Sequence, residues 1–283
     1  MTALPRLLLL SLPKAGTHLL SKAAAMLPGM QGSGLHVDFS YMARFVDDPD
    51  TVDPRQTGEW SIEVQPGSVH YYGLRKMLQA VCPGEYITSH LRYSRELVEL
   101  SNELGYRTVY IVRDPRDLAV SLAFYIPSQP GHELFEFFSS LSPEERITRA
   151  IVGSPKAENG VKRLRSLAHR LSKHAGWLHE PGVLTVRFED LVGSRGGGSA
   201  ERQSRTLSEL CRQIGLKPEP VVIDRIGHEL FGGTHTFRKG TIGDWKNHFS
   251  EYHLRLLEGD ANHRIVEFGY PVRKALGGEP IPS

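Results

Sequence analysis

The sequence predicts an α/β fold in which a mainly parallel central sheet is flanked by helices. Apolar runs of strand length alternate along the chain with longer segments of helical period, which is the pattern of successive βα units. The first run, Leu7 to Ser11, leads into a turn that contains a lysine and a glycine, and then into a helical segment. A buried strand that delivers such a turn to a helix is typical of proteins that bind a phosphate or sulfate group there.

The same patterns locate the individual elements. Strands are predicted at Leu7–Ser11, Tyr86–Ser89, Thr108–Val112 and Val183–Phe188. Helices are predicted at Thr17–Met26, Arg95–Leu104, Arg116–Tyr125, Ala157–Gly176, Ser199–Ile214 and Glu251–Phe268. The three consecutive glycines of Ser194–Ser199 predict a flexible surface connection that is too short to link two domains. We therefore expect a single domain over residues 1–283.

Composition is consistent with one enzyme-sized domain. The chain has 283 residues, of which 40% are hydrophobic, and this is enough for a substantial core. Its 34 Lys and Arg residues nearly balance its 32 Asp and Glu residues, so no global basic field indicates nucleic acid as a partner. The two distant cysteines, Cys82 and Cys211, exclude a disulfide framework and suit a reducing cytosol. The N-terminal apolar run is shorter than the roughly 20 residues of a membrane span, so we expect a cytoplasmic protein with no membrane partner.

The turn within PKAGTHLL is the first candidate site. Lys14 and Gly16 lie between the predicted strand and helix, and Thr17 begins the helix. A Walker A motif would place the lysine after the last glycine and follow it directly with a hydroxyl residue that holds Mg²⁺. That order is absent here, which favours a cradle for an oxyanion without the usual metal. The alternative is a strand-to-helix turn that binds nothing.

Two later segments turn this local signal into a specific one. Tyr110–Ser121 reads YIVRDPRDLAVS, and Arg238–Phe249 reads RKGTIGDWKNHF. Together with PKAGTHLL, they resemble in the same order the three nucleotide-binding motifs of the cytosolic-type sulfotransferases, which use 3′-phosphoadenosine 5′-phosphosulfate (PAPS). The resemblance extends from about Leu7 to Tyr270 and rests on the motifs more than on the segments between them. It implies a P-loop-type fold and PAPS as co-substrate, with no metal.

The resemblance implies roles for the residues of the first motif. Lys14 would be catalytic, because a fixed cation stabilises the negative charge that builds on the leaving phosphate during in-line transfer. The 5′-phosphate would lie at the positive end of the helix. The nucleotide-binding residues of this segment would be Lys14, Ala15, Gly16, Thr17, His18 and Leu19. Leu19 stands where the family commonly has a tryptophan that stacks on adenine, and Phe188 replaces a tyrosine that also belongs to the nucleotide site.

The second motif supplies Arg113 and Ser121. Arg113 remains at the end of the predicted strand while Ser121 lies two turns into the following helix, so both side chains can converge on one anion. In the resembling family these two residues grip the 3′-phosphate, which distinguishes PAPS from ATP. A surface ion pair between Arg113 and a nearby aspartate is the alternative.

The third motif supplies Arg238, Lys239 and Gly240. In the resembling family this triplet folds over the 3′-phosphate, and the glycine lets the backbone N–H approach the ligand closely. We expect the glycine-rich segment from Phe231 to Gly243 to be loose when empty and to close on the nucleotide. A basic, solvated turn is the alternative.

His90 is the candidate general base. It follows the predicted strand Tyr86–Ser89, in TSHL, where the cytosolic sulfotransferases carry a histidine within a Lys-Thr-His segment. Histidine has a pKa suited to taking a proton from a hydroxyl group as that group attacks sulfur. Thr88 stands at the position of the family's lysine, so one expected cation near the transferred group is missing. Arg92 is a possible substitute.

The acceptor is the least determined part of the function. His36, Phe39 and Tyr41 lie after the first helix, where related enzymes build substrate walls, although such residues also pack in cores. The sequence predicts a sulfotransferase that makes a sulfate ester on a hydroxyl group of a small-molecule or carrier-bound acceptor. A P-loop phosphotransferase that uses ATP and Mg²⁺, or a non-catalytic nucleotide-binding protein, are the alternatives. The sequence leaves the acceptor and the oligomeric state open.

Overall fold

The computed structural model describes residues 4–37, 69–154, 164–217, 219–232 and 240–272. Contacts divide the chain into two compact units. The first unit comprises Met1–Arg113 and Gly176–Ile242, and the second comprises Asp114–Ala175 and Gly243–Ser283. The chain therefore passes from one unit to the other within the second motif and again within the third.

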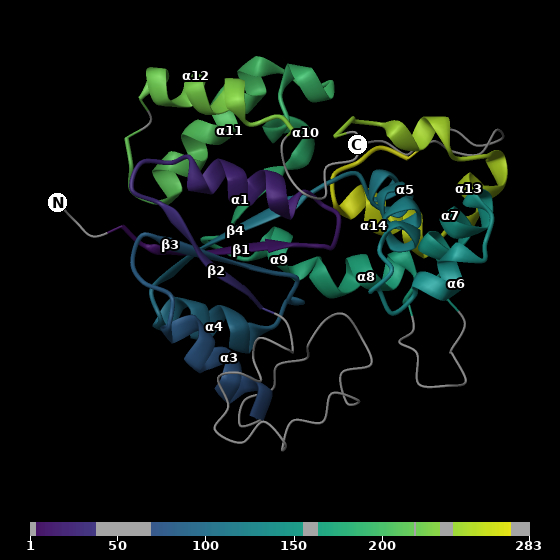
Figure 1. The fold of residues 1–283 in the computed structure, drawn as a ribbon, viewed down its shortest axis with the longest axis horizontal. Coiled ribbons are helices and arrows are strands. Elements are labelled where there is room, and N and C mark those ends of the chain that lie inside the picture. The colour runs from purple at the N-terminus through teal and green to yellow at the C-terminus, as the bar shows by residue number, and fades with distance from the viewer. Residues whose placement is uncertain (1–3, 38–68, 155–163, 218, 233–239, 273–283) are drawn as a thin grey trace. The chain divides into compact units, whose positions relative to one another are not determined.

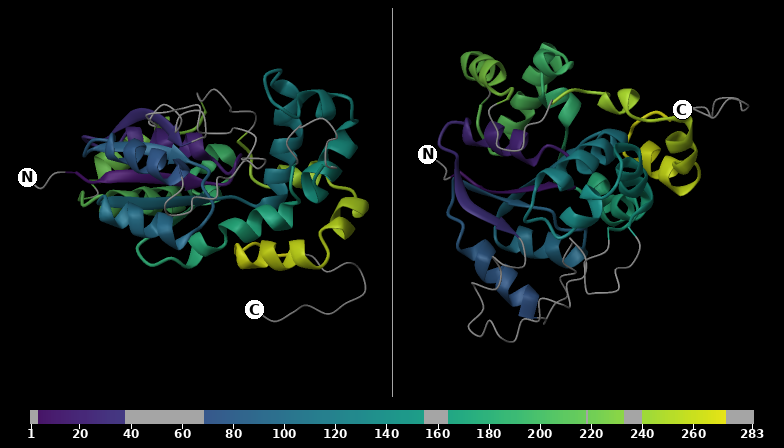
Figure 2. Two further views of the ribbon diagram at one scale, coloured as in Figure 1. Left: turned by 90° about the horizontal axis from the view of Figure 1, so that it is seen from below. Right: turned by 45° about the vertical axis from the view of Figure 1, so that its right-hand side comes forward.

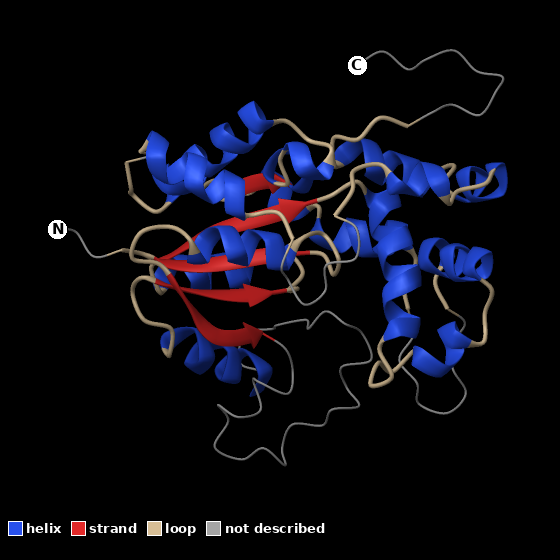
Figure 3. Cartoon of the chain, turned by 45° about the horizontal axis from the view of Figure 1, so that its top comes forward, coloured by secondary structure: helices blue, strands red, loops and turns tan. Residues whose placement is uncertain are grey.

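The first unit is built on a five-stranded sheet with the strand order β2-β3-β1-β4-β5, in which every pair is parallel (Figure 3). The strands are β1 (Arg6–Ser11), β2 (Gln31–Val37), β3 (Glu85–Ser89), β4 (Tyr106–Val112) and β5 (Leu184–Arg187). This sheet, flanked by helices, confirms the predicted fold class, and four of its strands lie where the sequence places them. The central position of β1 explains its composition, because Leu7 to Leu10 are fully buried.

Strand β2 was not predicted from the sequence. Its residues read QGSGLHV and are mostly exposed or only partly buried, because β2 lies at the edge of the sheet and pairs with β3 alone. The pairing is also irregular between Gly32 and His36, where Gly34 has a φ of 74°. An edge strand with a bulge carries neither an apolar run nor a regular alternation, so its sequence gives little signal.

Helices cover both faces of this sheet. Helices α1 (Thr17–Ala25), α11 (Ala200–Gln213) and α12 (Pro220–Glu229) lie on one side in Figure 1, and α3 (Val69–Gln79) and α4 (Arg95–Glu103) lie on the other. The views of Figure 2 show α11 and α12 beside α1. The core on that side joins Leu7, Leu9 and Val109 of the sheet to apolar side chains of these three helices. Short helices α9 (Gly176–His179) and α10 (Phe188–Leu191) flank β5.

The connection predicted at Ser194–Ser199 is partly at the surface, where Ser194, Arg195 and Gly197 are exposed, but it has local structure. Residues Ser194–Gly196 form the 3₁₀ helix η4, and Gly196 is buried. A Cβ atom on Gly196 would lie 2.4 Å from the Val192 side chain and 2.8 Å from the Gly240 carbonyl oxygen. Glycine is needed at position 196 because the backbone is closely packed there, whereas Gly197 has a φ of 88° and open space around it.

The second unit is helical throughout its described residues. It contains α5 (Pro115–Tyr125), η3 (Ile126–Ser128), α6 (Phe135–Ser139), α7 (Pro143–Val152), α8 (Leu167–His174), η5 (Asp244–Asn247), α13 (Glu251–Leu256) and α14 (Asp260–Glu267). Helix α5 contacts α7 and η5, α7 contacts α13, and α8 contacts α14. In the described part of the chain, no helix is long and apolar enough to cross a membrane.

Two predicted helices of this unit are too long. The helix expected at Ala157–Gly176 begins at Leu167, where Ser166 accepts a hydrogen bond from the His169 amide and caps it. Residues 157–163 of the predicted helix lie outside the described ranges. The helix expected at Glu251–Phe268 is interrupted at Gly259, which has a φ of 84°. A left-handed residue cannot continue an α-helix, so two shorter helices replace one.

Candidate active site

The first motif forms a strained turn between β1 and α1. Lys14 has a φ of 72°, which is unusual for a residue with a side chain, and Gly16 has a φ of 110°. A Cβ atom on Gly16 would lie 2.7 Å from a ring carbon of Phe188. Both the backbone angle and the lack of room therefore require glycine at position 16.

The start of α1 is suited to an anion. No side chain of the described residues caps this helix, and its first turn holds no acidic residue. The first N–H groups of a helix have no intrahelical partners and lie at the positive end of its dipole. The Ala15 amide, by contrast, donates to the Leu12 carbonyl oxygen at 3.0 Å and shapes the turn itself. The predicted strand, turn and helix are all present, while the nucleotide contacts of these residues stay predictions.

Leu19 and Phe188 are both largely buried. Leu19 is 9% exposed and packs in the core beneath α1, and Phe188 is 5% exposed in the same core. The ring of Phe188 lies against Gly16 on one side. It therefore has a packing role in this structure, and contact of either side chain with a nucleotide stays a prediction.

His90 lies directly beside the first motif because β3 pairs with β1. Its Nδ1 atom is 2.9 Å from the Ser11 carbonyl oxygen and 3.1 Å from Ser11 Oγ. Since a carbonyl oxygen only accepts, Nδ1 carries the ring hydrogen, and the neutral imidazole then has its lone pair on Nε2. This is the tautomer that a general base requires. Ser11 itself was missed in the sequence, where a serine at the end of an apolar strand gives no functional signal.

The surroundings of His90 strongly disfavour its protonated form. Burial lowers the pKa of His90 from 6.5 to about 3, helped by the positive charges of His36, His18 and Lys14 and opposed by the hydrogen bond to Ser11. The imidazole is therefore unprotonated at neutral pH, and its basicity in this structure is low.

His36 is brought next to His90 by the pairing of β2 with β3. The two rings meet edge to face with centroids 5.0 Å apart, and His36 Nδ1 is 2.8 Å from Thr88 Oγ1. Thr88, which stands where the resembling sulfotransferases have a lysine, is thus hydrogen-bonded to His36 of the neighbouring strand. Phe39 and Tyr41, the other predicted acceptor residues, lie outside the described residues. Arg92 is 9% exposed.

Arg113 directly follows β4 and is the last residue of the N-terminal segment of the first unit. Its guanidinium lies over the ring of Phe188 at 4.3 Å, and Nη2 donates to the Thr241 carbonyl oxygen at 3.1 Å. Stacking and hydrogen bonding together limit the rotamers of a long side chain. In the third motif, Gly240 has a φ of 62°, which favours glycine, while its predicted close approach to a ligand stays a prediction. Arg238 and Lys239 lie outside the described residues.

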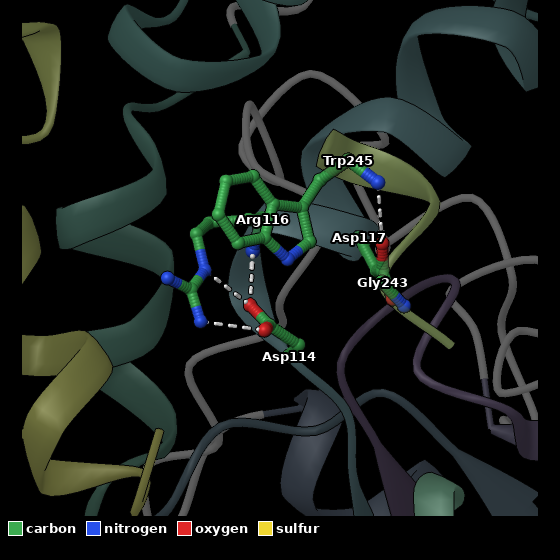
Figure 4. A network of polar contacts seen from close by, with 5 residues as sticks. All are labelled: Asp114, Arg116, Asp117, Gly243 and Trp245. Atoms are coloured by element: carbon green, nitrogen blue, oxygen red, sulfur yellow. Dashed lines mark hydrogen bonds and ion pairs between the residues drawn. The ribbon is translucent and has the colours of Figure 1, made fainter. Parts of the chain in front are cut away.

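The second unit joins the same two motifs through Asp117 (Figure 4). Asp117 accepts hydrogen bonds from the Gly243 amide at 2.8 Å and the Trp245 amide at 2.9 Å. Asp114 caps α5 and holds Arg116 through both carboxylate oxygens, and the Arg116 guanidinium lies 4.2 Å from the centre of the Trp245 ring. Trp245 thus packs as a structural residue.

The network around Asp117 was not predicted, although both aspartates of the RDPRD sequence take part in it. A buried carboxylate that accepts two backbone N–H groups satisfies donors that would otherwise be costly to bury. Ser121 lies on α5 in this unit and is partly exposed. Its convergence with Arg113 stays a prediction. Within the described ranges, no group of His, Cys, Asp and Glu side chains could hold a metal ion.

Replacing Asp117 by Asn should destabilise the protein. The amide oxygen of asparagine can accept a hydrogen bond from one of the two backbone N–H groups. Its NH₂ group then faces the other N–H group and cannot accept a hydrogen bond from it. We expect the free energy of unfolding to fall by about 2 kcal/mol, measured by denaturant unfolding. Asp260→Asn is the control, because that side chain is 69% exposed. An equal loss in the two variants would contradict the role of Asp117.

The depressed pKa of His90 predicts a specific pH dependence of stability. Unfolded chains protonate this histidine below about pH 6.5, whereas the folded protein resists protonation until about pH 3. Unfolding therefore binds a proton in this window, and stability falls as the pH drops through it. His90→Gln should flatten the decline measured by urea unfolding at several pH values. Parallel curves for the two proteins would show that His90 is not held neutral.

Comparison with known proteins places this geometry in a structural class. No protein-family model and no curated protein matches the sequence. Among solved structures, mouse sulfotransferase SULT7A1 complexed with PAP has a TM-score of 0.59 and 16% identity, over 93% of this chain and 85% of that one.

Two other solved structures are similar. Retinol dehydratase in complex with androsterone and the inactive cofactor PAP has a TM-score of 0.57 and 16% identity, over 92% of this chain and 80% of that one. The sulfotransferase domain from the curacin biosynthetic pathway has a TM-score of 0.50 and 14% identity, over 96% and 100%. The chain therefore has the α/β fold of the sulfotransferases.

Proposed function

We propose that this chain is a sulfotransferase that transfers the sulfuryl group of PAPS to a hydroxyl acceptor, giving a sulfate ester and adenosine 3′,5′-bisphosphate (PAP). The observation that carries the proposal is the bond between His90 Nδ1 and the Ser11 carbonyl oxygen, 2.9 Å long. It holds a neutral imidazole, with its lone pair on Nε2, beside a turn suited to an anion. A base and an anion cradle in this relation are what transfer between a phosphosulfate and an alcohol requires.

The proposed reaction is a direct in-line displacement. The acceptor oxygen attacks sulfur while its proton passes to Nε2 of His90, and the bond between sulfur and the bridging oxygen of PAPS breaks. Lys14 stabilises the charge that builds on that bridging oxygen. The start of α1, with Thr17 and His18, binds the 5′-phosphate. PAP leaves, and the proton on His90 returns to solvent.

Selectivity for the nucleotide is assigned to the 3′-phosphate. Arg113 is held by Phe188 and Thr241 and is proposed to bind that group. Ser121, Arg238, Lys239 and Gly240 complete the proposed set. His36 is proposed to line the acceptor site, together with Phe39 and Tyr41. A reaction without a metal and a cytoplasmic location remain expectations from the sequence.

Nucleotide affinity tests the proposed function. PAP should bind at least about tenfold more tightly than adenosine 5′-phosphate, because charge-assisted bonds to the 3′-phosphate are strong. Arg113→Ala should remove most of this preference, while Arg205→Ala, which changes a side chain that is 67% exposed, should not. Calorimetry without added Mg²⁺ is the measurement. Equal affinity of the unchanged protein for both nucleotides would refute the assignment and favour a phosphotransferase.

Turnover tests the role of His90. With PAPS and a library of hydroxyl acceptors, mass spectrometry should detect an added sulfuryl group, and His90→Ala should lower turnover by about 100-fold or more. PAP affinity should stay nearly intact, because the base acts on the acceptor. Lys14→Ala should instead weaken transfer and donor binding together. His263→Ala, at an exposed position on α14, is the control. Undiminished turnover in His90→Ala would assign the proton to another group.

A further inference from the structure

Ser11 links the anion cradle to the candidate base. Its hydroxyl oxygen is 2.6 Å from Thr17 Oγ1 and 3.1 Å from His90 Nδ1. Thr17 is the first residue of α1, and His90 is the first residue after β3. Ser11 is fully buried at the end of β1, between these two elements. The Ser11 side chain therefore contacts one residue of the proposed anion cradle and the proposed base.

The hydrogen bonds around Ser11 can run in one direction from His90 to Thr17. His90 Nδ1 must donate, because the Ser11 carbonyl oxygen lies 2.9 Å from it and cannot donate. Ser11 Oγ therefore accepts from Nδ1, and either hydroxyl group can be the donor in its bond to Thr17. When Ser11 donates this hydrogen bond, the Thr17 hydroxyl hydrogen is directed elsewhere. At the start of an uncapped helix, an anion is the acceptor that this position suits.

We propose that Ser11 is a positioning residue that orients the Thr17 hydroxyl group toward the donor's 5′-phosphate while it holds His90 with Nε2 unprotonated. The inference rests on the proposed function, since it needs a phosphate in the cradle and an acceptor at Nε2. It makes the donor site and the base parts of one hydrogen-bonded unit. The hydrogen bonds within a buried chain of this kind polarise one another, so loss of one member weakens the remaining bonds.

A serine whose hydroxyl group only makes hydrogen bonds within the core would behave differently. Its removal would lower stability without changing nucleotide affinity. If Ser11 orients Thr17, loss of the Ser11 hydroxyl group should weaken PAP binding. This effect should vanish when Thr17 has already lost its own hydroxyl group. The two explanations therefore differ in a double-mutant cycle.

The experiment measures PAP affinity by calorimetry in Ser11→Ala, Thr17→Val and the double variant. Each single change should weaken PAP binding about fivefold, the scale of one hydrogen bond. The double variant should be no more than about fivefold weaker, whereas independent losses would multiply to about 25-fold. Ser101→Ala, which changes a buried serine on α4, is the control for loss of a buried hydroxyl group and should bind PAP normally. Thermal unfolding checks that every variant is folded.

A second measurement needs no variant. Nitrogen-15 NMR of the unchanged protein with PAP should show hydrogen on Nδ1 of His90 and none on Nε2. Multiplying losses in the cycle, normal PAP affinity in Ser11→Ala, or hydrogen on Nε2 would each overturn the role of Ser11 and leave the proposed function standing. Failure of the unchanged protein to bind PAP would overturn the proposed function and this inference together.

Discussion

The parallel pairing of β1 with both β3 and β4 is the constraint on which the candidate site depends. Parallel strands end at the same edge of a sheet, so Ser11, His90 and Arg113 come together there although they are distant in the sequence. The pairing is held by Leu7 to Leu10, which are buried between two layers of helices. A slip of one residue would withdraw Ser11 from His90 and move the charged Arg6 into the apolar layer. The chemistry at this edge is therefore maintained by the hydrophobic core.

Electrostatics at this edge favour a neutral base and an anionic ligand at the same time. Burial is the largest cause of the low pKa of His90, and Lys14 and His18 add to it from the first motif. An anion bound at Lys14 would offset the contribution of its positive charge and raise the basicity of the imidazole. The hydrogen bond to the Ser11 carbonyl oxygen places the lone pair on Nε2. We therefore expect the protein to set the orientation of the imidazole and the ligand to change its base strength.

The second and third motifs are joined mainly through backbone groups. Arg113 donates to the carbonyl oxygen of Thr241 in the first unit, and Asp117 accepts from the amides of Gly243 and Trp245 in the second. A backbone partner is the same for every residue type, so such contacts leave no sign in the sequence of the partner segment. They keep the described part of the third motif in place where the chain crosses between units. Loss of the Asp117 carboxylate is costly because it leaves the N–H groups of Gly243 and Trp245 without an acceptor.

The sequence by itself determined the elements with strong local causes. Four of the five strands, the glycine turn at Gly16 and the helix capped by Asp114 follow from apolar runs, backbone angles and capping chemistry that act within a few residues. Only the tertiary structure decided the edge strand β2, the break at Gly259 and the pairing of His36 with His90, because these depend on neighbours that are remote in the chain. The position of His90 was predicted from a strand end, but its tautomer was not. That property is set by one carbonyl oxygen of the adjacent strand, which every residue type possesses and which only folding brings within 2.9 Å.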